Sequence, residues 1–104
     1  MRKQVFNIIT NQYINGNWGV GDIAFSITSK KKALDQMDTI HKLIETGEWF
    51  CGGENHYSIE TDTMNPLEGQ PRFIRDIIVK CEETEVLIIY RMVESPLNST
   101  YISK

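Results

Sequence analysis

The sequence lacks the features that mark a membrane protein, a secreted protein or a disulfide-rich scaffold. No apolar run approaches the roughly 18 residues that a membrane-spanning helix needs. The first residues, Met-Arg-Lys-Gln-Val-Phe-Asn, turn polar before the apolar centre of a signal peptide could form. There are only two cysteines, Cys51 and Cys81, too few for a disulfide framework. We therefore expect a cytoplasmic protein that has no membrane partner and keeps both thiols free.

Motifs that bind phosphates or metals are also missing. Three glycines between positions 16 and 21 fit neither phosphate-binding motif, because no Lys-Ser/Thr pair follows them and their surroundings predict a hairpin. Four residues have the atom types that zinc prefers: His41, Cys51, His56 and Cys81. They lack the short paired spacing of a zinc finger or ribbon, so we expect no metal and no cofactor.

What is present is an ordinary globular composition. The 104 residues are 40% hydrophobic and 24% charged, which fits a single domain over residues 1–104. From about residue 95 the chain is polar, and we expect a loosely held tail there. The net charge of −3 argues against direct binding of nucleic acid.

The stretch from Ser29 to Gly47 is the only long run with a helical period. Its apolar stripe consists of Ala33, Leu34, Met37, Ile40, His41 and Ile44. Thr28 or Ser29 is the expected N-cap, and Gly47 is placed to end the helix, since glycine adopts a left-handed conformation without steric cost. Because His41 lies on the apolar stripe, we expect it at the edge of the core rather than in a ligand site.

Residues 3–28 predict a long β-hairpin, because Asn15-Gly16 is a strong signal for a two-residue turn. Such a turn pairs residues whose numbers sum to 31. The pairs expected on this basis are Phe6–Phe25, Ile8–Ile23 and Tyr13–Trp18. Tyr13 and Trp18 then share a face near the tip, where they either cap the edge of the core or form an exposed docking pair.

The second half of the chain predicts three more strands. We expect one strand or two short ones over residues 48–59, a loop over 61–71 and a hairpin over 72–94 with its turn at 82–85. The expected pairs are Cys81–Val86, Val79–Ile88, Ile78–Ile89 and Asp76–Arg91. Residues 72–81 also fit a helical stripe, although the β-branched runs favour a strand.

The predicted fold is therefore α+β, with two layers. A mostly antiparallel sheet, in the order ββαβββ, packs against one long amphipathic helix. One helix covers only one face of such a sheet, so the other face must be solvated or covered by a partner.

The most informative functional feature is a region without cations. Between Leu43 and Pro71 there is no lysine or arginine. The six carboxylates in this region are Glu45, Glu48, Glu54, Glu60, Asp62 and Glu68. If they share a surface, its negative field attracts a basic partner and raises the association rate.

We therefore expect a small non-enzymatic protein that neutralises a basic protein by occlusion, such as an immunity protein or inhibitor of a nuclease-type toxin, whose nucleic-acid channel must be positive. The residues expected to bind the partner are Glu45, Glu48, Glu54, His56, Tyr57, Glu60, Asp62, Glu68, Tyr13 and Trp18. Two alternatives stay open. Cys51 and His56 could form the nucleophile and base of a small enzyme, or the uncovered sheet face could pair with a second copy as a homodimer.

Overall fold

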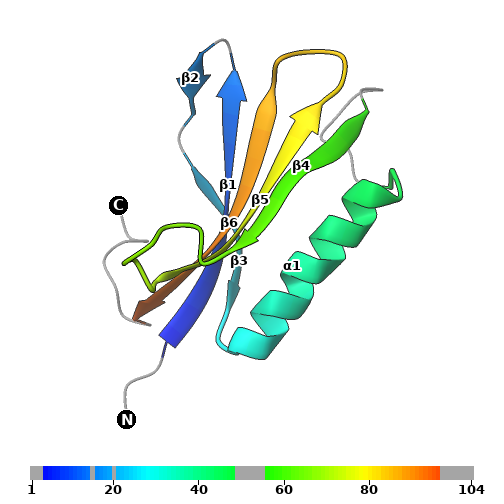
Figure 1. Ribbon diagram of the computed structural model, residues 1–104. Coiled ribbons are helices and arrows are strands. Elements are labelled where there is room, and N and C mark those ends of the chain that lie inside the picture. Colours follow the sequence, from blue (N-terminus) through cyan, green and yellow to red (C-terminus); the bar gives the residue numbers. More distant parts are fainter. Residues whose placement is uncertain (1–3, 15, 20, 49–55, 97–104) are drawn as a thin grey trace.

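The computed structural model describes residues 4–14, 16–19, 21–48 and 56–96, which form an antiparallel sheet with one helix on one face (Figure 1). The elements are β1 (Gln4–Ile14), β2 (Asn17–Trp18), β3 (Asp22–Ile27), α1 (Lys30–Glu45), β4 (Tyr57–Met64), β5 (Phe73–Cys81) and β6 (Leu87–Pro96). Across the sheet the order is β2-β1-β6-β5-β4, and β3 also pairs with β1. This confirms the predicted α+β class; the second predicted strand is divided into β2 and β3, so the order is βββαβββ.

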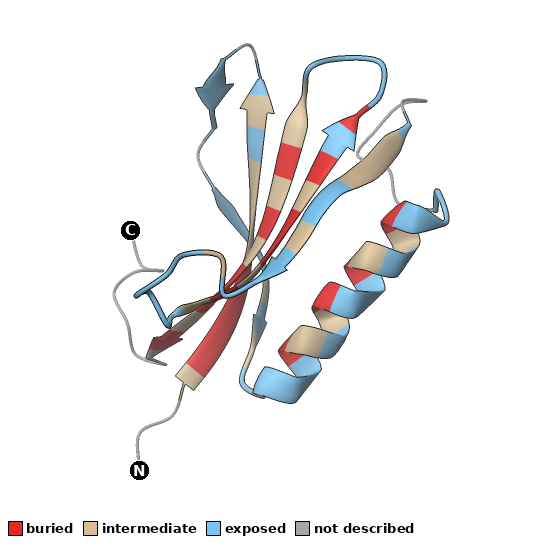
Figure 2. Ribbon diagram, viewed as in Figure 1, coloured by how far each residue is buried: buried red, intermediate tan, exposed pale blue. Residues whose placement is uncertain are grey.

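Helix α1 begins and ends where its capping residues predict. The hydroxyl of Ser29 accepts a hydrogen bond from the backbone N–H of Lys32 at 3.3 Å, as an N-cap does. Gly47, with φ of +80°, stops the helix in the left-handed conformation. Figure 2 shows the buried residues of α1 on the side turned toward the sheet. Within the described residues, no helix is long and apolar enough to cross a membrane.

The hydrophobic core lies between α1 and the sheet. Four helix residues, Ala33, Met37, Ile40 and Ile44, are almost fully buried against the strands. The strand residues of this core are Phe6, Ile8, Ile74, Ile77, Val79, Ile88, Tyr90 and Met92. All of them come from β1, β5 and β6, the three interior strands, so the helix covers the middle of the sheet.

The register of the first hairpin is correct at its tip and wrong farther along. Tyr13 pairs with Trp18 as predicted. The predicted pairs Phe6–Phe25 and Ile8–Ile23 do not form; the observed pairs are Phe6–Ile27, Ile8–Phe25 and Ile9–Ile23. The return strand gains one residue between β2 and β3 and a second at a bulge beside Ile8 and Ile9. As a result Ile23 points to the face opposite the helix.

Strand β4 ends later than predicted. Of the expected strand over 48–59, residues 49–55 lie outside the described part of the chain, and β4 runs from Tyr57 to Met64. Residues 61–64, predicted as loop, continue β4 because β5 offers them a hydrogen-bonding edge: Asp62 pairs with Ile77 and Met64 with Arg75. The loop starts at Asn65, whose φ of +51° ends the strand.

The second hairpin has the predicted register, with Val79 opposite Ile88, Ile78 opposite Ile89 and Asp76 opposite Arg91. Cys81 donates its backbone N–H to Val86 at 3.0 Å, which closes the predicted turn. Residues 73–81 are a strand, so the helical interpretation of this segment is wrong.

Candidate functional site

The predicted partner-binding residues fall into separate parts of the molecule. Glu54 lies outside the described residues. Glu45, Glu48, His56 and Tyr57 lie near the C-terminal end of α1 and the start of β4, at the upper end in Figure 1. Glu60 is exposed at the bulge of β4, and Glu68 is exposed in the loop between β4 and β5, near the opposite end of the sheet. The carboxylates of this stretch that the structure describes therefore do not share one surface.

A different set of carboxylates lies at one end of the molecule. The turn between β5 and β6 carries three more glutamates, and it lies beside the start of β4, since the N–H of Glu82 donates to the carbonyl of His56 at 2.9 Å. The C-terminal end of α1 lies at the same end of the molecule (Figure 1), and we term the glutamates of the two segments the acidic end: Glu45, Glu48, Glu82, Glu83 and Glu85. Lys42 and Lys80 are the described cations nearest to it in sequence. The C-terminal end of the helix dipole adds to the negative field there.

His56 and Glu83 fasten the β5–β6 turn to the start of β4. One carboxylate oxygen of Glu83 accepts the backbone N–H of His56 at 2.8 Å, and the other lies 2.7 Å from Nδ1 of the imidazole. The hydrogen bond to Glu83 raises the pKa of His56, and the same contact lowers the pKa of Glu83. The acidic turn is therefore held in a defined position.

Aromatic side chains lie at the same end of the sheet. The rings of Tyr13 and Trp18 are 4.9 Å apart between centroids, and Trp18 is 49% exposed. Tyr13 pairs with Leu87, which follows the acidic turn directly. Trp18 is thus exposed and Tyr13 partly buried, on an edge adjoining the acidic end. Their role as a docking pair stays a prediction.

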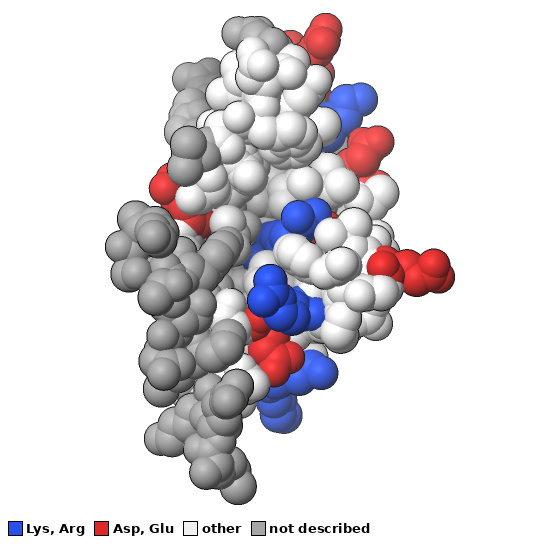
Figure 3. All heavy atoms as spheres, turned by 90° about the vertical axis from the view of Figure 1, so that its left-hand side faces the viewer, with Lys and Arg blue, Asp and Glu red and all other residues white. Residues whose placement is uncertain are grey.

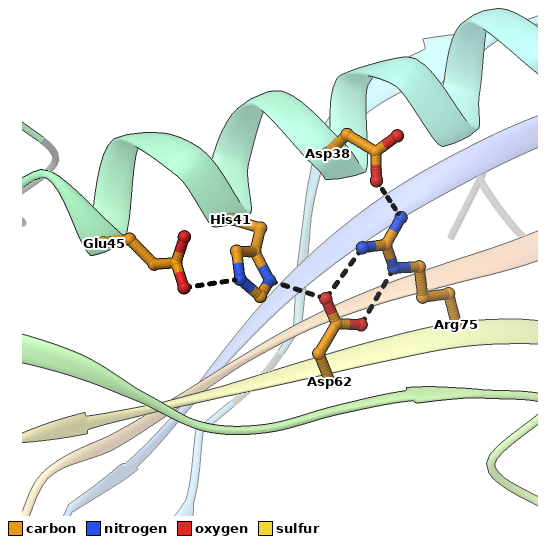
Figure 4. A network of polar contacts seen from close by, with 5 residues as sticks. All are labelled: Asp38, His41, Glu45, Asp62 and Arg75. Atoms are coloured by element: carbon orange, nitrogen blue, oxygen red, sulfur yellow. Dashed lines mark hydrogen bonds and ion pairs between the residues drawn. The ribbon is translucent and has the colours of Figure 1, made fainter.

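Asp62 belongs to a separate network that joins the helix to the sheet (Figure 4). Its carboxylate accepts two hydrogen bonds from Arg75, from Nε to Oδ1 at 2.9 Å and from Nη2 to Oδ2 at 2.7 Å. Oδ2 also lies 2.6 Å from Nδ1 of His41. Arg75 also donates to Asp38 at 2.7 Å, and Nε2 of His41 lies 3.1 Å from Glu45. Because Asp62 is only 17% exposed and already paired, it has little negative field to offer a partner.

Each charged group of this network stabilises the charged form of its neighbours. The Arg75 guanidinium lowers the pKa of Asp62, against the opposing effect of burial and with help from His41. Burial lowers the pKa of His41, but hydrogen bonds to Asp62 and Glu45 outweigh it, so the net pKa is raised. Both ring nitrogens of His41 face carboxylates, an arrangement that suits the doubly protonated imidazolium. This matches the prediction of a histidine at the edge of the core.

The residues considered for nucleophilic or zinc chemistry are only partly described. Cys51 lies outside the described residues, and Cys81 is a buried free thiol. Within the described ranges, no three His, Cys, Asp or Glu side chains are grouped as a metal site. The Cys51–His56 pair therefore stays a prediction.

Sequence reasoning missed Glu82, Glu83 and Glu85, which it assigned only to a turn. The signal was the run Glu-Glu-Thr-Glu at the tip of a hairpin, where side chains project from the sheet.

Comparison of the chain with protein-family models, curated proteins and solved structures gave no significant match.

Proposed function

We propose that this protein is a small binding protein without catalytic activity, which neutralises a basic protein partner by covering its positive surface. The observation that carries the proposal is the acidic end: the glutamates of the β5–β6 turn and those at the C-terminal end of α1 lie at the same end of the molecule, with Lys42 and Lys80 the described cations nearest in sequence. Glu45 and Glu83 contact histidines, so Glu48, Glu82 and Glu85 supply most of its negative field. A nuclease-type toxin is the best-motivated partner, since its nucleic-acid channel must be positive and carboxylates can occupy it in place of phosphates.

The construction of the acidic end supports binding rather than chemistry. The β5–β6 turn is fastened by the contacts between His56 and Glu83, so little conformational freedom is lost when a partner docks. Glu82 and Glu85 are exposed, so their carboxylates face solvent and an approaching partner. A fixed array of exposed charges accelerates encounter with an oppositely charged protein, an effect that weakens as salt is added.

The test begins with a partner purified from the native source and measures its association rate with variants of this chain by stopped flow. Glu82→Lys with Glu85→Lys reverses two charges of the acidic end. Asp22→Lys with Glu68→Lys makes the same change in net charge at exposed positions elsewhere. We expect the first variant to associate at least about tenfold more slowly at low salt, and the control to change by less than about threefold.

Equal association rates for the two variants at low salt would refute the electrostatic mechanism. If the partner is a nuclease, its inhibition by the wild-type chain provides the functional readout. The enzymatic alternative is tested separately by alkylation, because an activated Cys51 thiolate reacts quickly at neutral pH whereas an inert thiol does not.

A further inference from the structure

The sheet face opposite α1 carries apolar side chains that no described helix covers. We term the upper part of this face the distal patch: Ile9, Trp18, Ile23, Ile78, Leu87 and Ile89. Cross-strand pairing joins Ile9 to Ile23 and Ile78 to Ile89, so these side chains are neighbours on one face. Trp18 and Ile23 are exposed, and the others are partly exposed.

The distal patch adjoins the acidic end directly. Leu87 is two residues beyond Glu85 and stands opposite Tyr13, the ring partner of Trp18. Figure 3, which looks at the side away from the helix, shows an area without charged side chains in its upper part, with acidic and basic side chains along its upper right margin. An apolar surface with a negative rim is complementary to a segment that is apolar on one side and basic on the other.

We infer that the distal patch and the acidic end together bind an amphipathic basic segment of the partner protein. Its apolar side chains lie on the patch and its arginines or lysines face the glutamates of the β5–β6 turn. This inference rests on the proposed function and adds the chemistry of the partner's contact segment.

The size of the patch favours a single segment over a second copy of the chain. The patch spans four strand positions across the sheet, with β2 and β3 sharing one; at about 4.8 Å between positions and about five residues along each, its footprint is on the order of 300 Å². A stable interface between globular proteins buries about 800 Å² on each partner. A single helix or strand laid across the sheet fits the smaller footprint.

Arg91 and Lys80 are described cations on this face, and their charges differ in how far they are neutralised. Arg91 is held by Asp76 through two hydrogen bonds of 2.8 Å and lies over the ring of Phe73, so its charge is already paired. Lys80 is exposed beside Leu87 and repels a basic segment locally. We therefore expect Lys80→Glu to strengthen the binding of a basic segment.

The experiment titrates the full chain with three synthetic helical peptides and follows backbone amide shifts by NMR. The first peptide carries leucines on one side and arginines on the other, the second replaces leucine with serine, and the third replaces arginine with glutamate. We expect the leucine–arginine peptide to bind at least about tenfold more tightly than either of the others. Its binding should shift the amides of Leu87 and Ile89 as well as those of residues 82–85.

Variants with matched exposure separate the patch from the rest of the surface. Trp18→Ala removes a side chain of the distal patch that is 49% exposed, whereas Met64→Ala removes one of 50% exposure on β4. Neither side chain is in the core, so both variants should fold. Trp18→Ala should weaken binding of the leucine–arginine peptide at least about threefold and leave that of the serine–arginine peptide unchanged. Met64→Ala should alter neither.

The outcomes distinguish the two proposals. If both arginine peptides bind equally and shift only residues 82–85, the patch inference is overturned and the acidic binding function stands. If neither arginine peptide shifts residues 82–85, the proposed function fails as well. Shifts of the patch amides with protein concentration alone, accompanied by dimer formation in light scattering, would assign the patch to a second copy and overturn the inference.

Discussion

Replacing Asp62 with asparagine removes the central charge of the network that joins α1 to the sheet. The amide keeps the shape of the carboxylate but removes its charge. Arg75, whose side chain is 11% exposed, then keeps Asp38 as its one described carboxylate partner. Removing one partner of a buried ion pair typically costs about 3–5 kcal/mol. Since Arg75 keeps Asp38, which is itself 67% exposed, we expect a loss of about 2–3 kcal/mol in the free energy of unfolding.

Urea unfolding followed by circular dichroism at neutral pH measures this loss as a shift in midpoint with an unchanged slope. For a chain of this size the corresponding fall in Tm is about 10–20 °C. Asp38→Asn serves as the control, because an exposed pair contributes less than about 1 kcal/mol. The double variant Asp62→Leu with Arg75→Met, which leaves no unpaired charge in this pair, should be more stable than Asp62→Asn alone.

The effect of Asp62→Asn should also depend on pH with a defined sign. Because Arg75 lowers the pKa of Asp62, the contribution of the carboxylate to stability is complete above its unfolded value of about 4 and is lost as pH falls through the lowered pKa. The difference between wild type and Asp62→Asn should therefore shrink in acid. A difference below about 0.5 kcal/mol at neutral pH, within the range of ordinary surface substitutions, would show that the network does not hold the helix to the sheet.

Three further predictions concern the same scaffold. His41→Gln should be most destabilising below about pH 6.5 and less so as pH rises. The reason is that the pKa of His41 is raised in the folded state, so the protonated ring stabilises the fold and this stabilisation is lost as the ring deprotonates. Urea midpoints at several pH values measure the change. Gly47→Ala should lower the free energy of unfolding, measured by thermal denaturation, by about 1 kcal/mol. The left-handed φ of +80° strains alanine, although the added Cβ would meet nothing within 4 Å. Gly19→Ala, at a position without a positive φ, is the control. Ile40→Ala, at a fully buried core position, should cost about 2–5 kcal/mol in urea unfolding, and a smaller loss would mean that the core collapses around the cavity.

The parts of the fold that sequence predicts well depend on short-range patterns. The ends of α1 follow from Ser29 and Gly47, and the register of β5 with β6 follows from apolar runs on both sides of a short turn. The first hairpin was predictable only near its tip, because each bulge shifts the pairing by one residue and leaves no strong mark in the sequence.

The candidate site was harder to predict because its charges combine across the fold. In the sequence Asp62 is one of six similar carboxylates, but in the structure Arg75 on the neighbouring strand pairs with it. No local sequence pattern predicts that contact. Glu85 and Glu48 are far apart in sequence and belong to the same end of the molecule. A scan of charge along the chain finds a cation-free stretch, whereas a partner meets charges as they are arranged in space.

The division of the outer strand into β2 and β3 has a consequence for the chain in crowded solution. Strand edges recruit other chains when they present a long row of free N–H and C=O groups. Here β2 ends at Trp18 and β3 begins at Asp22, while on the other margin the pairing of β4 with β5 shifts register between Ile59 and Thr61. Neither margin of the described sheet is a long unbroken strand edge, so we expect the protein to resist edge-to-edge polymerisation.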